Sequence, residues 1–201
     1  MRVESLMTGP LEATNEAYAL AKLAGMGLCR AYAQQYEAPF VSAIPADTFG
    51  PGDDFSPEDS HVVPALIRRM HEAKASGAEA VEIWGTGRPR REFVYIDDAA
   101  DACVVVMRRH NGPEPINLGG GAALSIGEVA AVIKEAVGYA GALRFDASKP
   151  DGMPVKVLDS SALLALGWRP QTPLREALRA TYEWFVRRAD DAPTPVFPVP
   201  D

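Results

Sequence analysis

Apolar residues between positions 17 and 31 recur every three or four places, with polar residues between them. This spacing brings the apolar side chains onto one face of a helix. We therefore predict a helix from about 17 to Tyr36, with Asn15 as the residue that caps its start. The same period predicts four further helices, over about 61–75, from Asp97 or Asp98 through 102–107, from about 126 to Val137, and over 174–185.

Two of these helices carry start signals in the sequence. Ser125 and Glu128 have the spacing of a capping box, in which each side chain accepts a hydrogen bond from the other residue's backbone N–H. Thr172 followed by Pro173 is typical of an N-cap residue and a proline at the first helical position. Both signals place helix starts within one residue of where the apolar period begins.

Short apolar runs alternate with the predicted helices and indicate buried strands. The first runs from Phe40 to Ile44 and is expected to stop at Pro45, after which Asp, Gly, Pro and Ser predict a loop over 46–60. Strands that alternate with helices favour an α/β fold with a parallel sheet. The remaining predicted strands cover 81–84, 93–96, 115–118 and 143–146.

The composition argues against several classes of function. The 201 residues are 47% hydrophobic and 23% charged, the balance of a globular protein. A net charge of -7 argues against nucleic-acid binding, which needs fields of Lys and Arg. The two cysteines and three histidines are scattered, so we expect no metal site. No apolar run is long enough to span a bilayer and no signal core opens the chain, so we expect a cytoplasmic protein without membrane contact.

Tyr18 and Lys22 form the first candidate for chemistry. They lie four residues apart on the predicted helix, which puts a phenol and an ammonium on one face. A nearby ammonium favours the phenolate, so such a pair can pass a proton to or from a carbonyl or alcohol oxygen while a hydride moves. The spacing alone is a weak signal, and a helix that happens to carry one Tyr and one Lys is the alternative.

The sequence around this pair is that of a known family. Residues 15–29, Asn-Glu-Ala-Tyr-Ala-Leu-Ala-Lys-Leu-Ala-Gly-Met-Gly-Leu-Cys, resemble the catalytic helix of extended short-chain dehydrogenases, and of the GDP-L-fucose synthase family in particular. The resemblance covers roughly residues 5–188, and its specificity comes from motifs that follow one another in the family's order. The other motifs are Phe49-Gly-Pro51, residues 60–69, Trp84-Gly-Thr-Gly87, Arg91-Glu-Phe93, Asp97-Asp98, residues 146–152 and Leu166-Gly-Trp168.

The resemblance implies NADP(H)-dependent epimerisation and reduction of a GDP-4-keto-6-deoxy-hexose. It assigns Tyr18 as the proton donor to the C4 oxygen and Lys22 as the residue that holds the nicotinamide ribose. It assigns His61 as the acid that protonates carbon during epimerisation; an imidazole exchanges protons near neutral pH. Without the resemblance, a capping or loop histidine is the alternative. The implied cofactor contacts are Tyr18, Lys22, Pro45, Ala46, Asp47, Thr48 and His61.

The resemblance also implies a binding set for the GDP-sugar. It consists of Arg69, Trp84, Arg91 and Asp151, with Lys149 as a less certain neighbour. Guanidinium groups suit the oxygens of a pyrophosphate because they bind them bidentately. The pattern leaves Trp84 open: its ring is either a flat face for a guanine or sugar, or a core aromatic at the end of a strand.

The chain departs from the family pattern in two places. In the family a glycine-rich turn for the NADP pyrophosphate, a catalytic serine and a cysteine base precede the Tyr helix, and no such stretch occurs before Tyr18. Gly119–Gly121 does not replace that turn, because Leu124 breaks the G-x-G-x-x-G pattern. Near the nicotinamide, Asp47 stands where the family pattern has asparagine, and a carboxylate accepts hydrogen bonds but donates none.

We therefore expect an α/β chain that forms the C-terminal part of an extended Rossmann-type fold with a small α/β substrate domain. Residues 1–50 and elements within about 80–120 are assigned to the NAD(P)-binding domain. Residues 51–79 and 121–188 are assigned to the substrate-binding region, and 189–201 to a disordered tail.

The expected partners and activity follow from the same assignment. Family members are homodimers packed through the Tyr helix, so the resemblance implies a homodimer through the helix that carries Tyr18. Without the upstream half we expect no turnover, and poor solubility or association through exposed strand edges and apolar surface. Two other functions stay open: a related NAD-dependent nucleotide-sugar epimerase or dehydratase, and a non-catalytic nucleotide-sugar-binding remnant.

Overall fold

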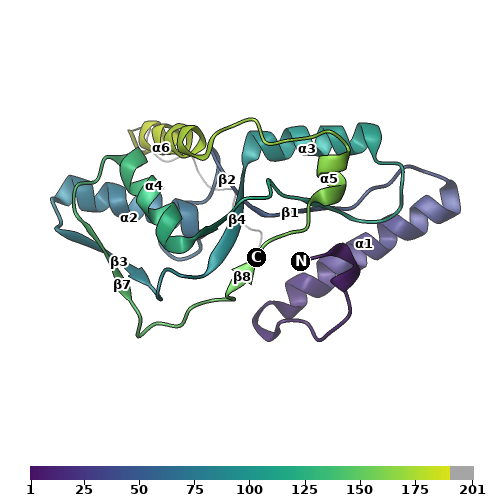
Figure 1. Ribbon diagram of the computed structural model, residues 1–201, viewed down its shortest axis with the longest axis horizontal. Helices are drawn as coiled ribbons and strands as arrows, with labels where there is room; N and C mark the ends of the chain where they lie inside the picture. The colour runs from purple at the N-terminus through teal and green to yellow at the C-terminus, as the bar shows by residue number, and fades with distance from the viewer. Residues whose placement is uncertain (191–201) are drawn as a thin grey trace, which may run out of the picture.

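The computed structural model describes residues 1–190. The first long element of the chain is a helix that stands apart from the remaining elements (Figure 1). Two single turns, Val3–Ser5 and Ala13–Asn15, lead into α1, Glu16–Tyr36. The helix ends at Glu37, whose left-handed backbone (φ 52°) reverses the chain. No residue of α1 is buried, although it is the longest helix described.

The strands form three small sheets, and most of their pairs are parallel. In the central sheet β4 is the middle strand, with β2 on one edge and the antiparallel β6 on the other. The three sheets comprise β1 (Ala43–Pro45) with β5 (Ile116–Leu118), then β2 (Asp47–Phe49), β4 (Arg90–Tyr95), β6 (Ala123–Ser125) and β8 (Val155–Lys156), and finally β3 (Ala80–Trp84) with β7 (Ala142–Asp146).

Two larger hydrophobic cores and one small cluster, formed by Ala46, Val94 and Ala99, hold these elements together. The larger lies between α2 (Val62–Ser76), α4 (Ile126–Val137), α6 (Leu174–Asp190) and the β3–β7 sheet, and it contains Ile67, Met70 and Leu178. The smaller joins α3 (Ile96–Arg109) and α5 (Ser161–Ala165) to β5 around Val106 and Trp168. In Figure 1 the larger core lies on the left and the smaller one on the right, toward α1.

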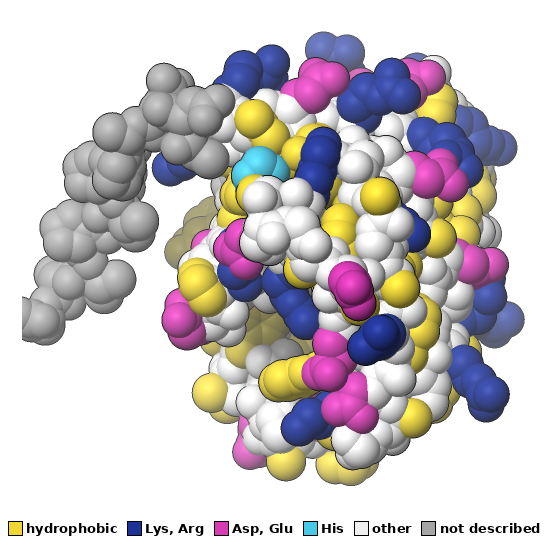
Figure 2. All heavy atoms as spheres, turned by 90° about the vertical axis from the view of Figure 1, so that its left-hand side faces the viewer, with side chains coloured by type: hydrophobic (Ala, Val, Ile, Leu, Met, Phe, Trp, Pro, Cys, Tyr) yellow, Lys and Arg dark blue, Asp and Glu magenta, His cyan; other side chains and the backbone are white. Residues whose placement is uncertain are grey.

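The end of the molecule formed by the larger core carries mixed charge. Figure 2 shows that basic and acidic side chains alternate over this face, with hydrophobic side chains between them. No single sign of charge dominates the face. Among residues 1–190, no helix is long and apolar enough to cross a membrane.

The predicted helices and strands over 61–75, 81–84, 115–118 and 143–146 are confirmed within a few residues. So is the capping box: Ser125 Oγ accepts from the Glu128 amide (3.1 Å) and Glu128 Oε2 accepts from the Ser125 amide (2.7 Å). Helix α1 begins where predicted, but the Asn15 side chain makes no capping hydrogen bond. Helix α6 extends to Asp190, and the rest of the predicted tail, 191–201, lies outside the described residues.

The strand expected over 93–96 begins earlier, at Arg90, and ends at Tyr95, because α3 begins at Ile96. Two further boundaries were predicted wrongly. The strand expected over 40–44 begins at Ala43 and includes Pro45, which is tolerated because its place in the ladder needs no donor. After Ala46, whose amide donates to the Leu118 carbonyl (2.8 Å), the chain continues into β2, so the predicted loop starts only after Phe49.

The second of these two boundaries concerns α6. This helix starts at Leu174 rather than at Pro173, so Thr172 is not its N-cap. The Thr172 hydroxyl and amide both donate to the buried Asp98 carboxylate (3.1 Å each), which draws this residue away from the helix start.

Candidate active site

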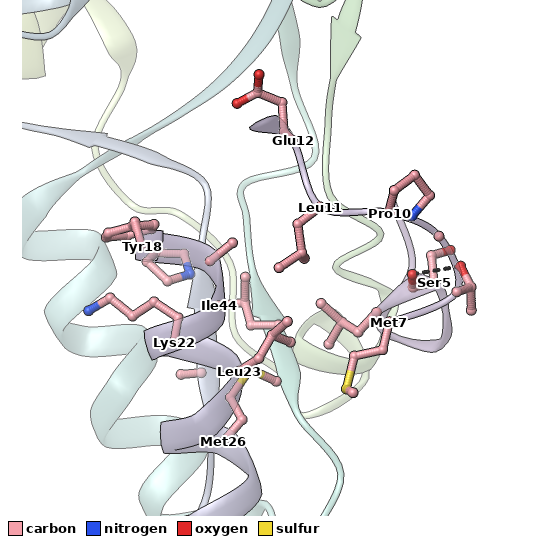
Figure 3. A pocket seen from close by; sticks show the side chains of 16 residues that line it. Ser5, Met7, Pro10, Leu11, Glu12, Tyr18, Lys22, Leu23, Met26 and Ile44 are labelled. Carbon is pink, nitrogen blue, oxygen red and sulfur yellow. Dashed lines mark hydrogen bonds between the residues drawn. The ribbon is translucent and has the colours of Figure 1, made fainter. Parts of the chain in front are cut away.

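Tyr18 and Lys22 lie side by side on α1, as the four-residue spacing predicts. The Lys22 Nζ atom is 5.3 Å from the centre of the Tyr18 ring, and 61% of Tyr18 is exposed. Both residues line a cavity of about 670 Å³ between α1 and the segment 5–12. In Figure 3 the two side chains extend to the same side of α1, while Leu11 and Ile44 point toward the middle of the cavity. The phenol and the ammonium are therefore both accessible at the rim of an apolar hollow.

His61 lies in a second, smaller pocket of about 330 Å³. It is the residue before α2, and its side chain makes no capping hydrogen bond, so it is free for another role. Asp47 and Thr48 line the same pocket from β2. Lys156 on β8 enters it as well, and its Nζ is 2.6 Å from Asp47 Oδ1.

Trp84 stands at the end of β3 and is 67% exposed, so the alternative of a core aromatic is wrong. The ring faces solvent, with the Lys149 Nζ 5.5 Å from its centre. The next residues form a turn fixed by Asp151, whose carboxylate accepts from the Thr86 amide (2.8 Å) and the Thr86 hydroxyl (2.6 Å). These bonds hold the pKa of Asp151 below its ordinary value, because they stabilise the carboxylate.

The two predicted phosphate-binding arginines each hold a backbone carbonyl. Arg69 donates from α2 to the carbonyl of Glu82 in β3. Arg91 donates from β4 to the Met153 carbonyl at 2.6 Å, which fastens the segment after Asp151 to the central sheet. These bonds fix the positions of both side chains.

Glu92, next to Arg91 in β4, holds two neighbouring segments in place, and the sequence reasoning missed it. It is only 1% exposed, and its carboxylate accepts two backbone hydrogen bonds, from Gly121 (2.6 Å) and Leu158 (2.9 Å). It therefore ties the glycine turn and the end of β8 to β4, directly beside Arg91. A Cβ atom at Gly119 would lie 2.3 Å from Glu92 Oε1, so the carboxylate occupies space that only glycine leaves open.

The sequence model of the NAD dependent epimerase/dehydratase family matches residues 1–119, more than half of the chain. The chain belongs to this family.

Within the epimerase/dehydratase family, the chain is similar to proteins named GDP-L-fucose synthase. The chain is 51% identical to "Probable GDP-L-fucose synthase 1" of Oryza sativa subsp. japonica and 45% identical to the GDP-L-fucose synthase of Escherichia coli K12, over 94% of its own length in each case. These matches cover 57% and 62% of the relatives, so the chain spans little more than half of their length. The predicted resemblance to GDP-L-fucose synthases is confirmed.

The fold is also similar to that of a solved family member. A GDP-L-fucose synthetase from Naegleria fowleri superposes with a TM-score of 0.88 at 35% identity, over 96% of this chain and 61% of that one. The same protein has been solved bound to NADP, with the same TM-score. The predicted α/β fold of the extended Rossmann type is therefore confirmed.

The predicted site residues of this epimerase/dehydratase chain fall into three groups. Tyr18, Lys22 and Pro45 share the larger cavity, and Asp47, Thr48 and His61 share the smaller pocket. Ala46 lies between them but is buried against Val94 and Ala99, so it offers only backbone atoms. The third group is Arg69, Trp84, Arg91 and Asp151, around the β3 end and the segment after β7.

Of the two residues that the sequence reasoning missed, Glu92 had a weak signal in the sequence and Lys156 had none. Glu92 stands between Arg91 and Phe93 in the Arg91-Glu-Phe93 motif, where strand alternation turns its side chain away from that of Arg91. A charged residue on the inner side of a strand needs partners, and that alone marks it. Lys156 belongs to a two-residue strand, which is too short to show a period.

Proposed function

We propose that this chain forms the sugar-binding and Tyr–Lys part of an NADP(H)-dependent epimerase/reductase that acts on a GDP-4-keto-6-deoxy-hexose. The observation that carries the proposal is the accessible Tyr18–Lys22 pair at the rim of the larger cavity. The similarity to proteins named GDP-L-fucose synthase supports the choice of substrate class.

The residues present fit a bound nicotinamide ribose. The Lys22 ammonium and the Tyr18 hydroxyl are both accessible, so they can donate hydrogen bonds to ribose hydroxyls and to a substrate oxygen. Pro45 lines the same cavity. NADPH, when bound, supplies the hydride that reduces the C4 ketone.

The protein's own residues manage the protons in this scheme. The Tyr18 hydroxyl donates its proton to the C4 oxygen as that oxygen gains charge, and the Lys22 ammonium stabilises the phenolate that remains. His61 donates a proton to carbon in the epimerisation step after a base has removed the original proton from that carbon; in the family that base is a cysteine that precedes the Tyr helix. Asp47 and Thr48 complete the wall of the His61 pocket.

GDP is proposed to bind at Trp84, Arg69, Arg91 and Asp151. The exposed Trp84 ring offers a stacking face for guanine, and stacking of a base on an aromatic side chain contributes about 1–3 kcal/mol. The guanidinium groups supply the charge for the diphosphate. Asp151 holds the Thr86 turn that follows Trp84.

Trp84→Ala is expected to weaken GDP binding by about tenfold or more, since it removes the stacking face without opening the core. Titration calorimetry of GDP into the chain measures the effect. Tyr32→Ala, which removes another exposed aromatic from α1, is the matched control and should leave the affinity unchanged. Equal affinities for the Trp84 variant and the wild type would overturn this GDP site.

A second candidate is a non-catalytic binder of nucleotide sugars. It is favoured by the placement of the third group, Trp84, Arg91 and Asp151, on elements other than α1. The two functions differ in one measurement: the binder takes up GDP but shows no affinity for NADPH. For a protein that includes the upstream half, product analysis by NMR separates the epimerase/reductase from related epimerases or dehydratases.

We propose a homodimer through α1, together with a cytoplasmic location and the predicted domain division. Leu28, Tyr32 and Tyr36 are exposed and follow one another every four residues, so they form an apolar row along the helix, and the exposed Leu20 precedes this row. The smaller core joins α3 and β5 of the cofactor-side range, and it also includes Leu163 and Trp168, which the predicted division assigns to the substrate region.

Leu28→Glu is expected to reduce self-association of the chain, because it places a charge in the centre of this row. Sedimentation velocity at several concentrations measures the change. Met107→Glu, at an exposed position of the separate helix α3, is the control and should leave association as it is. A wild-type chain that is a monodisperse monomer and melts cooperatively would count against the interface.

A further inference from the structure

Asp47 and Lys156 meet where two short strands follow one another along the same edge of β4. Strand β2 pairs with residues 93–95 of β4, and β8 pairs with Arg90 and Arg91. Strand β6 pairs with residues 90–92 and lies on the edge opposite to β2, so β8 must share the edge that β2 occupies. The 2.6 Å ion pair between Lys156 Nζ and Asp47 Oδ1 spans the junction.

This ion pair determines the charge of the His61 pocket. Apart from His61, Lys156 is the basic residue among those lining it, and Asp47 is the acidic one. The other lining residues are Asn15, Thr48, Val62, Val63, Pro64 and Phe93, none of which carries a charge. With the Asp47 and Lys156 charges paired, the lining residues carry no net charge when the imidazole is neutral. The Asp53 carboxylate, outside the lining, interacts with His61 and adds negative charge nearby.

The pair contributes little to the stability of the fold. The Lys156 side chain is 49% exposed and that of Asp47 is 28% exposed, so solvent screens their attraction. Removal of one charge therefore leaves the fold in place and changes the field in the pocket by one unit. The pair can therefore determine which ligand charge the pocket accepts without affecting the fold.

We propose that Asp47 is a specificity-determining residue: by holding Lys156 it keeps the His61 pocket neutral, so that the pocket takes an uncharged polar group and the diphosphate is directed to Arg91. Arg91 is the register partner of Lys156 in the β4–β8 ladder, so two basic side chains lie at neighbouring positions. Only Lys156 is neutralised by a carboxylate. Arg91 is thus the remaining cation of the two for an anionic ligand.

The proposal deepens the proposed function, since it assigns the uncharged part of the ligands to the His61 pocket. It also says what changes physically when position 47 carries Asp, as in this chain, instead of the Asn of the family pattern. An asparagine there would accept a hydrogen bond from Lys156 but leave its charge uncompensated. The lining residues would then carry one positive charge more than in this chain, and the pocket would attract phosphate more strongly.

The test is calorimetric titration of inorganic pyrophosphate into the full chain at low salt. Asp47→Asn is expected to raise the affinity about fivefold over the wild type, the size expected for one added charge near solvent. The gain should vanish at about 0.5 M salt, where screening is strong. Glu114→Gln, which makes the same change of net charge at an exposed position outside the pocket, should give no gain.

Two results would overturn the proposal. The first is an Asp47→Asn variant that binds pyrophosphate no better than Glu114→Gln does. The second is a gain that survives in the double variant Asp47→Asn, Lys156→Gln, because the added charge would then not come from Lys156. Failure of the wild type to bind GDP would overturn the proposed function instead, and it leaves the pyrophosphate comparison intact.

Discussion

Gly119→Ala is expected to lower the free energy of unfolding by about 3 kcal/mol. The added methyl group would lie 2.3 Å from Glu92 Oε1 and 2.5 Å from the buried Ser160 Oγ. The carboxylate cannot simply move aside, because it accepts the amides of Gly121 and Leu158 in a site with almost no exposure. Overpacking and the disruption of buried charged hydrogen bonds each cost about 1–3 kcal/mol.

Gly120→Ala is the matched control for this prediction. Neither glycine has a left-handed backbone, so the backbone conformation admits alanine at both positions and the two differ only in the space around the Cβ atom. A Cβ atom at Gly120 would meet Pro170 at 3.5 Å, which is ordinary van der Waals contact. Urea denaturation of both variants should therefore separate them by several kcal/mol, and equal stabilities would show that Glu92 does not hold the turn as described.

Tyr18→Phe is expected to reduce kcat by about a hundredfold or more in a protein in which the family's N-terminal half precedes this chain. The change removes the hydroxyl that donates a proton to the C4 oxygen, and a positioned general acid is worth about 10²–10⁴ in rate. Since Tyr18 is largely exposed, the loss should leave the melting temperature unchanged. Loss of NADPH absorbance with the GDP-keto-sugar follows the reaction.

Tyr32→Phe provides the control on the same helix. It removes a hydroxyl of equal chemistry from a similarly exposed tyrosine that lies outside the larger cavity. Its kcat should match that of the wild type. If the two variants had equal activity, proton donation by Tyr18 would have to be abandoned.

The long elements were predictable because their periods extend over several turns. Helices α1, α2 and α4 each carry an apolar repeat over at least twelve residues, and α4 adds a capping box. The short elements were not predictable, since strands such as β8, with two residues, contain no period. Thr172 was wrongly predicted as an N-cap because its hydroxyl and amide donate to Asp98, a buried carboxylate that is distant in sequence.

The candidate site also contains residues that were predictable from local spacing and residues that were not. The Tyr18–Lys22 pair follows from helical spacing, so its geometry could be derived from a stretch of five residues. The exposure of Trp84 could not, because a strand end permits both a buried and an exposed aromatic. Glu92 and Lys156 depend on pairing between segments more than sixty residues apart, which no local pattern records.

The absence of buried residues from α1 has a consequence for the dynamics of the chain. Local opening costs little where few side chains are packed, so the amides of α1 should exchange hydrogen faster than those of α2 or α4, which contribute to the larger core. The Tyr18–Lys22 pair thus stands on the cooperative unit that opens most easily. Any molecule that binds the closed form of α1 more tightly will be thermodynamically linked to its order, and will slow that exchange in proportion to its affinity and concentration.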